Sequence, residues 1–161
     1  MARPRITAAP DVPVIVIDTE LDAPAALLLR AHLEPELVAQ WLGPRRLRTR
    51  IDEHDVRHGG RWRMVQIDED GAEHGFRGVH HGEPSVEGGI TRTFEYDGAP
   101  GHVSFETLTF HERDGRTVLR AVALFQSVED RDAMIAAGME RGVVESMDRL
   151  EELTARLAAG G

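Results

Sequence analysis

The chain has 161 residues, of which 41% are hydrophobic, and this supports one compact domain but not a second core. Its formal net charge of -9 disfavours nucleic acid and anionic membranes as partners, because both would repel an acidic protein. All 19 basic residues are arginine, and the lack of cysteine excludes disulfides, thiolate metal sites and a cysteine nucleophile.

The N-terminal part of the chain predicts an arm, a strand and two short helices. Residues 1–11 are expected to form a flexible arm, and the β-branched residues 14–21 predict the first strand. Asp22-Ala23-Pro24 then predicts the start of a helix, with Asp22 as its cap. The two helices are predicted over residues 25–32 and 35–41, with Gly43-Pro44 ending the second.

Neither an apolar signal-peptide core nor a run of 18 apolar residues is present in the sequence, so we expect a soluble, cytoplasmic protein.

Six further strands are predicted as a series of hairpins. Asp-Gly pairs at positions 70–71, 97–98 and 114–115 are typical hairpin turns. Neighbouring strands joined by short turns pair antiparallel. The six strands are predicted over residues 47–54, 61–67, 74–82, 88–96, 102–111 and 117–126.

The C-terminal part of the chain predicts a helix that is interrupted once. Ser127 and Asp130 have the spacing of a capping box, and Gly138 and Gly142 indicate a break or a close packing point. An amphipathic helix that follows a run of strands buries its apolar stripe against the sheet. The sequence therefore predicts an α+β fold with about seven antiparallel strands curved around the C-terminal helix, in one domain over residues 12–158. The stripe consists of Val143, Met147, Leu150, Leu153 and Leu157.

Six short segments form an ordered set: Ala23-Pro24, residues 40–44, residues 55–63, residues 100–103, Gly115-Arg116-Thr117 and residues 138–142. This set resembles the START-like SRPBCC superfamily, and within it the heat-shock protein 90 ATPase activator homologue-like family, over residues 12 to about 158. The resemblance implies the helix-grip fold of START domains and the birch pollen allergen, in a family of mixed function whose members often have the label polyketide cyclase. One departure is Leu42, where many relatives have a second tryptophan.

The helix-grip fold predicts a ligand cavity between the sheet and the C-terminal helix. Trp41 and Trp62 are the only tryptophans, and each is interpreted either as core packing or as a wall against which a planar ligand stacks. The residues predicted to line the cavity are Trp41, Trp62, Met64, Phe76, Arg92, Phe94, Glu106, Leu108, Met139 and Val143.

Arg92 and Glu106 are predicted to face each other on the inner face of the sheet. If the strands on either side of the turn pair symmetrically about Ala99, Ile90 faces Leu108, Arg92 faces Glu106 and Phe94 faces Ser104. The apolar neighbours of both charged residues favour the inner face. The pair is interpreted either as a structural ion pair or as a polar anchor for a ligand hydroxyl or carbonyl.

The sequence contains no recognisable catalytic motif, so the catalytic residues stay unknown. The histidine spacing does not match a metal site, the serines lack a nucleophile context, and no glycine-rich phosphate loop precedes a helix. We therefore predict binding of a small apolar or aromatic metabolite without cofactor or metal, and a homodimer stays open. The alternatives are a cyclase or hydratase, with Glu106 or His80 as acid or base and Arg92 polarising a carbonyl, and a co-chaperone-like module that binds a protein partner.

Overall fold

The predicted series of strands and helices is present in the computed structural model, which describes residues 2–160. All predicted boundaries agree within three residues, and the helix-grip architecture that the resemblance implies is confirmed. The strands are β1 (Arg5–Thr7), β2 (Val14–Leu21), β3 (Arg48–His54), β4 (Arg61–Ile67), β5 (Glu73–Ser85), β6 (Gly89–Tyr96), β7 (Val103–Arg113) and β8 (Arg116–Leu124). The helices are α1 (Ala25–Leu33), α2 (Pro35–Trp41), α3 (Val128–Ala136) and α4 (Met139–Gly160).

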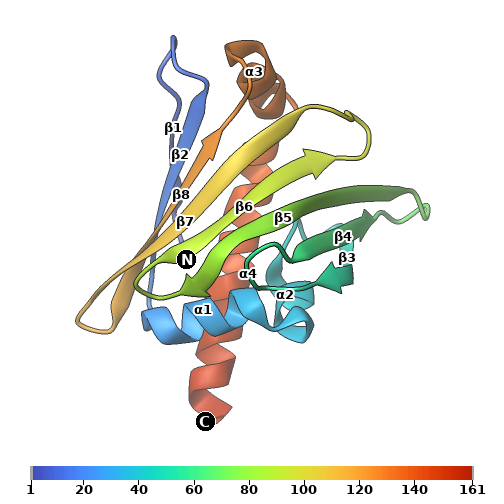
Figure 1. Cartoon of the computed structure of the whole chain (residues 1–161). Helices are drawn as coiled ribbons and strands as arrows, with labels where there is room; N and C mark the ends of the chain where they lie inside the picture. The colour runs from blue at the N-terminus through green and yellow to red at the C-terminus, as the bar shows by residue number, and fades with distance from the viewer. Residues whose placement is uncertain (1, 161) are drawn as a thin grey trace.

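The strands form one antiparallel sheet in the order β1-β2-β8-β7-β6-β5-β4-β3. Figure 1 shows α4 crossing one face of this sheet, with α1 and α2 near one end of the crossing and α3 near the other. We call the face toward α4 the inner face and the opposite one the outer face. The Asp114-Gly115 turn joins β7 to β8 with positive φ at both residues, as a tight two-residue hairpin requires.

The sheet has one strand more than the sequence predicts. The additional strand is β1, whose residue Ile6 pairs with Ile17 of β2, and it lies inside the segment predicted as a flexible arm. The β1–β2 connection is held by the buried Arg131 of α3, whose guanidinium donates to the backbone carbonyls of Ala9, Pro10 and Val12. A three-residue strand is too short to give a periodic pattern, so only these tertiary contacts reveal it.

The apolar core lies where α1, α2 and the C-terminal half of α4 meet the sheet. Leu21, Leu28 and Leu150 are completely buried there, and Leu153 is nearly so. Met147 and Leu157 pack against the same cluster while Val143 is only half-buried outside it, so four of the five predicted stripe residues contact the core. Each buried leucine contributes roughly 1.5–3 kcal/mol, which makes α4 part of the folding unit.

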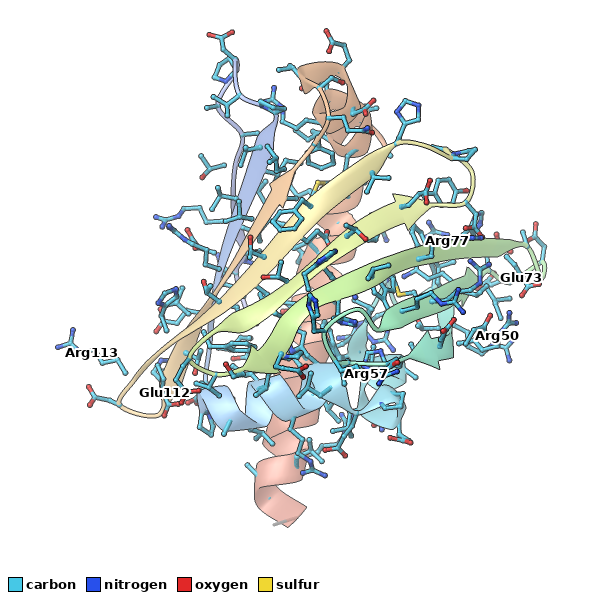
Figure 2. The ribbon with its side chains drawn as sticks, in the orientation of Figure 1. Arg50, Arg57, Glu73, Arg77, Glu112 and Arg113 are labelled. Atoms are coloured by element: carbon cyan, nitrogen blue, oxygen red, sulfur yellow. The ribbon has the colours of Figure 1, made fainter. Side chains whose placement is uncertain are left out.

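The ends of the helices are fixed by polar contacts, one of which differs from the prediction. Asp22 does not cap α1; instead, Glu112 of β7 accepts a hydrogen bond from the Ala25 N–H at 2.8 Å, and Figure 2 shows Glu112 beside the start of α1. Ser127 caps α3 as predicted, with its Oγ accepting from Asp130 N–H at 3.1 Å. Gly138 has a φ of 85° and separates α3 from α4, so the predicted helix break is confirmed.

Candidate functional site

A row of three polar side chains crosses the inner face of the sheet. His80 of β5 pairs with Arg92 of β6, and Arg92 pairs with Glu106 of β7. The predicted register is confirmed, because Ile90 also lies opposite Leu108 and Phe94 lies opposite Ser104. Side chains at directly opposed positions lie on one face with Cβ atoms about 5 Å apart. The three groups therefore form one polar row across the inner face of the sheet.

Arg92 lies at the centre of this row and is held there by two contacts. Its Nε donates to Glu106 Oε1 at 3.3 Å, and its guanidinium carbon lies 3.9 Å from the centre of the Trp62 ring system. The two side chains remain 24% and 32% exposed, so the pair is half-buried. No residue among 2–160 accepts a hydrogen bond from the two terminal nitrogens of Arg92. Arg92 is thus fixed by cation–π stacking and one hydrogen bond, and keeps donors free for a further partner.

Trp62 lies flat against the sheet because Gly78 provides the space. The Trp62 Nε1 donates to the Thr93 carbonyl at 3.1 Å. A Cβ atom at position 78 would be 1.9 Å from that carbonyl oxygen and 2.5 Å from the Trp62 Nε1. No side chain can occupy that space while the indole keeps its hydrogen bond. Gly78 is therefore required at the base of the site.

Four aromatic rings follow one another along the inner face. We call them the aromatic ladder: Trp62, Phe94, Phe76 and Tyr96. The successive ring centres are 5.8, 5.4 and 5.2 Å apart. None of the four belongs to the apolar core cluster, and the last three remain half-exposed although they face the side of the sheet that α4 crosses. Aromatic side chains that stay accessible on an inner face offer a stacking surface to a planar ligand.

Three histidines, namely His80 in the polar row and His32 and His54 beside it, favour the neutral form. Burial and the nearby charge of Arg92 lower the pKa of His32 to about 4, against the opposing effect of the 2.7 Å hydrogen bond from its Nδ1 to the Leu28 carbonyl. Burial, followed by the charge of Arg92, also lowers the pKa of His54 and of His80. His80 is 2% exposed and its Nδ1 has no hydrogen-bond partner. A buried polar atom without a partner is costly, so the Nδ1 of His80 is an unsatisfied hydrogen-bonding group in the polar row.

The structure separates the predicted lining residues into two groups. It brings together Trp62, Phe76, Arg92, Phe94 and Glu106.

The other predicted residues lie outside this group. Trp41 belongs to the apolar core, where its Nε1 donates to the Ala31 carbonyl at 3.0 Å, which supports its interpretation as core packing. Met64 is buried, and Leu108 packs against the core. Met139 and Val143 are half-buried in the first turns of α4.

Sequence reasoning missed Tyr96, His54 and Gly78 as members of the site. Tyr96 shares the parity of Arg92 and Phe94 along β6, which was a usable signal. His54 and Gly78 are brought to the site only by the pairing of β4 with β3 and β5, where Trp62 lies opposite both.

Two hollows on the surface lie beside this site rather than in it, the first of them bordered by residues 45–48 and 67–69. The second, of about 430 Å³, is bordered by Arg50, Arg63 and Asp97, and of the ladder only Tyr96 reaches it. Its arginines already have partners, with Arg50 pairing to Glu73 and Arg63 to Asp97, both at 2.7 Å. Figure 2 shows Arg50 and Glu73 close together at this edge of the sheet. We interpret this hollow as part of a surface ion-pair network.

No group of three or more histidine, cysteine or acidic side chains within residues 2–160 is placed to hold a metal ion. None of the helices in this range is long and apolar enough to cross a bilayer.

The comparison with protein families agrees with this geometry. The family described as "Activator of Hsp90 ATPase homolog 1-like protein" matches residues 22–155. The chain belongs to this family. Its matched region includes α1, α2 and all strands of the polar row and the aromatic ladder. No curated protein matches the sequence.

Solved structures similar to this family member share its fold. A protein from Rhodobacter sphaeroides has a TM-score of 0.86 at 21% identity, with 96% of this chain and 99% of that chain covered. A protein from Arthrobacter aurescens has a TM-score of 0.85 at 16% identity, covering 94% and 91% of the two chains. Protein CV1439 from Chromobacterium violaceum has a TM-score of 0.77 at 26% identity, covering 88% and 96%. The likeness extends over most of the chain and shows a shared fold.

Proposed function

We propose that this family member binds a small planar aromatic molecule on the inner face of the sheet, stacked on the aromatic ladder and anchored by Arg92 and Glu106. One observation carries the proposal: half-exposed aromatic rings adjoin a charged pair with unused hydrogen-bonding capacity, on the face that the helix crosses. Apolar sites with a few convergent polar groups are typical of small-molecule binding. The cysteine-free chain suits the reducing cytoplasm, where we place the protein.

The two tryptophan indoles provide an internal test of this proposal. Trp62 belongs to the ladder and Trp41 to the core. In ¹H–¹⁵N spectra, adding the neutral aromatic probe 2-naphthamide should move the Trp62 indole resonance and leave that of Trp41 in place. The Trp41→Phe variant assigns the two signals. Equal movement of both resonances, or of neither, would contradict binding at the ladder.

A matched pair of phenylalanine variants locates the binding surface. Phe94 lies in the ladder, whereas Phe105 lies on the outer face of β7 and is 43% exposed. Phe94→Leu should weaken 2-naphthamide binding about fivefold, since stacking contributes on the order of 1 kcal/mol beyond burial. Phe105→Leu should leave the dissociation constant unchanged. Similar affinities in the two variants would place the ligand elsewhere.

General acid–base catalysis is the second candidate function. His80 carries an unpaired buried nitrogen opposite Arg92 in the sheet, and the lowered pKa of His80 keeps the ring neutral near pH 7. A neutral imidazole beside a cation that polarises a carbonyl is a suitable proton acceptor. Turnover of a bound ligand that His80→Gln abolishes without weakening binding would favour this function over binding alone.

A further inference from the structure

The inner face carries one opposed pair of charges beside the aromatic ladder. The polar row contains one cation, Arg92, and one anion, Glu106, and their formal charges cancel. His80 in the row and the two histidines beside it, His32 and His54, add no charge at neutral pH, because burial lowers the pKa of each. The site is therefore electrically neutral before a ligand arrives.

Hydrogen-bonding capacity is unfilled on both the donor and the acceptor side. The terminal nitrogens of Arg92 can donate to a ligand carbonyl. Glu106 uses only one of its oxygens on Arg92, and the Nδ1 of His80 has no partner. A ligand with a carbonyl acceptor and an N–H or O–H donor would satisfy both kinds of group without adding charge.

A carboxylate ligand would meet a different environment. An arginine normally binds carboxylates through two parallel hydrogen bonds, so Arg92 alone would favour an aromatic acid. Glu106 already lies 3.3 Å from Arg92 Nε, so a ligand carboxylate on the same guanidinium would lie next to a like charge. Like charges at contact distance in a half-buried site repel each other with little screening.

We propose that Glu106 is a specificity-determining residue: it restricts the Arg92 site to uncharged aromatic ligands that carry both a hydrogen-bond acceptor and a donor, and it excludes aromatic carboxylates. This inference rests on the proposed function and deepens it, because it presupposes binding at the aromatic ladder. It assigns to Glu106 a role in choosing the ligand and to Arg92 a role in holding it.

Two probes of nearly identical shape separate charge from size. 2-Naphthamide is neutral and has both a donor and an acceptor, whereas 2-naphthoate differs by an oxygen anion in place of the amide nitrogen. At pH 7.5, 2-naphthamide should bind the unmodified protein at least about tenfold more tightly than 2-naphthoate, measured by titration of the Trp62 indole resonance. Glu106→Gln should remove this preference and strengthen naphthoate binding about tenfold or more, since glutamine keeps an acceptor for Arg92 but removes the charge.

A control variant accounts for the change in net charge. Glu87 is an exposed residue in the β5–β6 turn, and Glu87→Gln alters the charge of the whole protein equally. It should leave the ratio of the two affinities unchanged.

The outcomes separate the two proposals. Equal affinity of the unmodified protein for both probes overturns the role of Glu106 while leaving binding at the ladder intact, even if Glu106→Gln does not fold. An unchanged preference in a folded Glu106→Gln protein overturns it as well. If neither probe moves the Trp62 resonance, binding at the ladder fails, and the inference fails with it.

Discussion

At the scale of single residues, half-burial determines what the Arg92–Glu106 pair contributes. A fully buried pair would lose several kcal/mol on removal of one partner, because the remaining charge is isolated from water. Here both side chains keep about a quarter to a third of their exposure, and Trp62 stacks on the cation. If either partner is removed, water can still solvate the charge that remains. If Glu106 is the one removed, Trp62 also continues to stack on Arg92. The pair is therefore better suited to recognition than to stability.

A double-mutant cycle measures this contribution. Glu106→Leu and Arg92→Met should each lower the free energy of unfolding by about 1–2 kcal/mol, because each leaves one half-buried charge without its partner. The double variant should return close to the unmodified protein in urea denaturation. Glu73→Leu, which removes the half-exposed partner of Arg50, should cost less than about 1 kcal/mol. Strictly additive losses in the cycle would show that the pair is not coupled.

The same residues show how far sequence could predict the site. The Arg92–Glu106 pairing followed from loop symmetry and alternating parity, both local properties of two adjacent strands. Trp62 was predicted to line the cavity, as core packing or as a stacking wall, but its position over Gly78 depends on the pairing of β4 with β5. A contact between non-adjacent segments has no signature in either segment alone. The shared face of Phe94 and Tyr96 along β6 could thus be predicted from sequence. The ring contacts that these two residues make with Trp62 of β4 and Phe76 of β5 could not.

At the scale of secondary-structure elements, one side chain secures the N-terminal edge of the sheet. Arg131 is 4% exposed, pairs with Asp132 at 2.9 Å and donates to three backbone carbonyls between β1 and β2. The longer strands could be predicted because each has its own apolar alternation or turn signal. By contrast, β1 has only three residues and depends on this remote arginine, so its position could not be read from residues 1–11.

Removing the Arg131 guanidinium should therefore release β1 selectively. Arg131→Met keeps much of the apolar stem but leaves the carbonyls of Ala9, Pro10 and Val12 without a buried donor, which should lower the free energy of unfolding by roughly 1–3 kcal/mol. Amide hydrogen exchange should show faster exchange over residues 5–7. Protection in β7 and β8 should persist at the native level, and Arg113→Met, at a 94% exposed side chain, should change neither region. Unaltered exchange over residues 5–7 in Arg131→Met would refute this dependence.

At the scale of the whole molecule, stability and recognition occupy different parts of the sheet–helix interface. The closed core gathers α1, α2 and the C-terminal half of α4. The aromatic ladder lies outside this cluster: Trp62 is buried, while Phe76, Phe94 and Tyr96 stay partly accessible. His32 connects the two regions, because its ring contacts Trp41 and Phe110 of the core and its pKa responds to Arg92 of the polar row. A neutral histidine at this junction links the stability of the fold to pH.

Acid should destabilise the protein through His32 in a defined pH window. The pKa of His32 is about 4 in the folded protein and about 6.5 in an unfolded chain. Between these values the unfolded state binds more protons, so the free energy of unfolding falls as pH falls from about 6.5 to 4 and is fully restored above 6.5. His32 alone should account for roughly 3 kcal/mol across the window, at about 1.4 kcal/mol per pH unit. Burial also lowers the pKa of His54 and His80, which adds loss of the same sign.

Urea denaturation at pH 7.5, 6 and 5 tests this for His32→Asn, whose amide can still donate to the Leu28 carbonyl that His32 Nδ1 binds. This variant should lose clearly less stability between pH 7.5 and 5 than the unmodified protein. The acidic groups whose pKa is lowered by arginine partners, such as Asp18 and Asp97, stay ionised over most of this range in both folded and unfolded chains, so they contribute little to the difference. His111→Asn, at an exposed histidine, should follow the unmodified protein. Parallel pH profiles for His32→Asn and the unmodified protein would mean that the protonation of His32 is not coupled to folding.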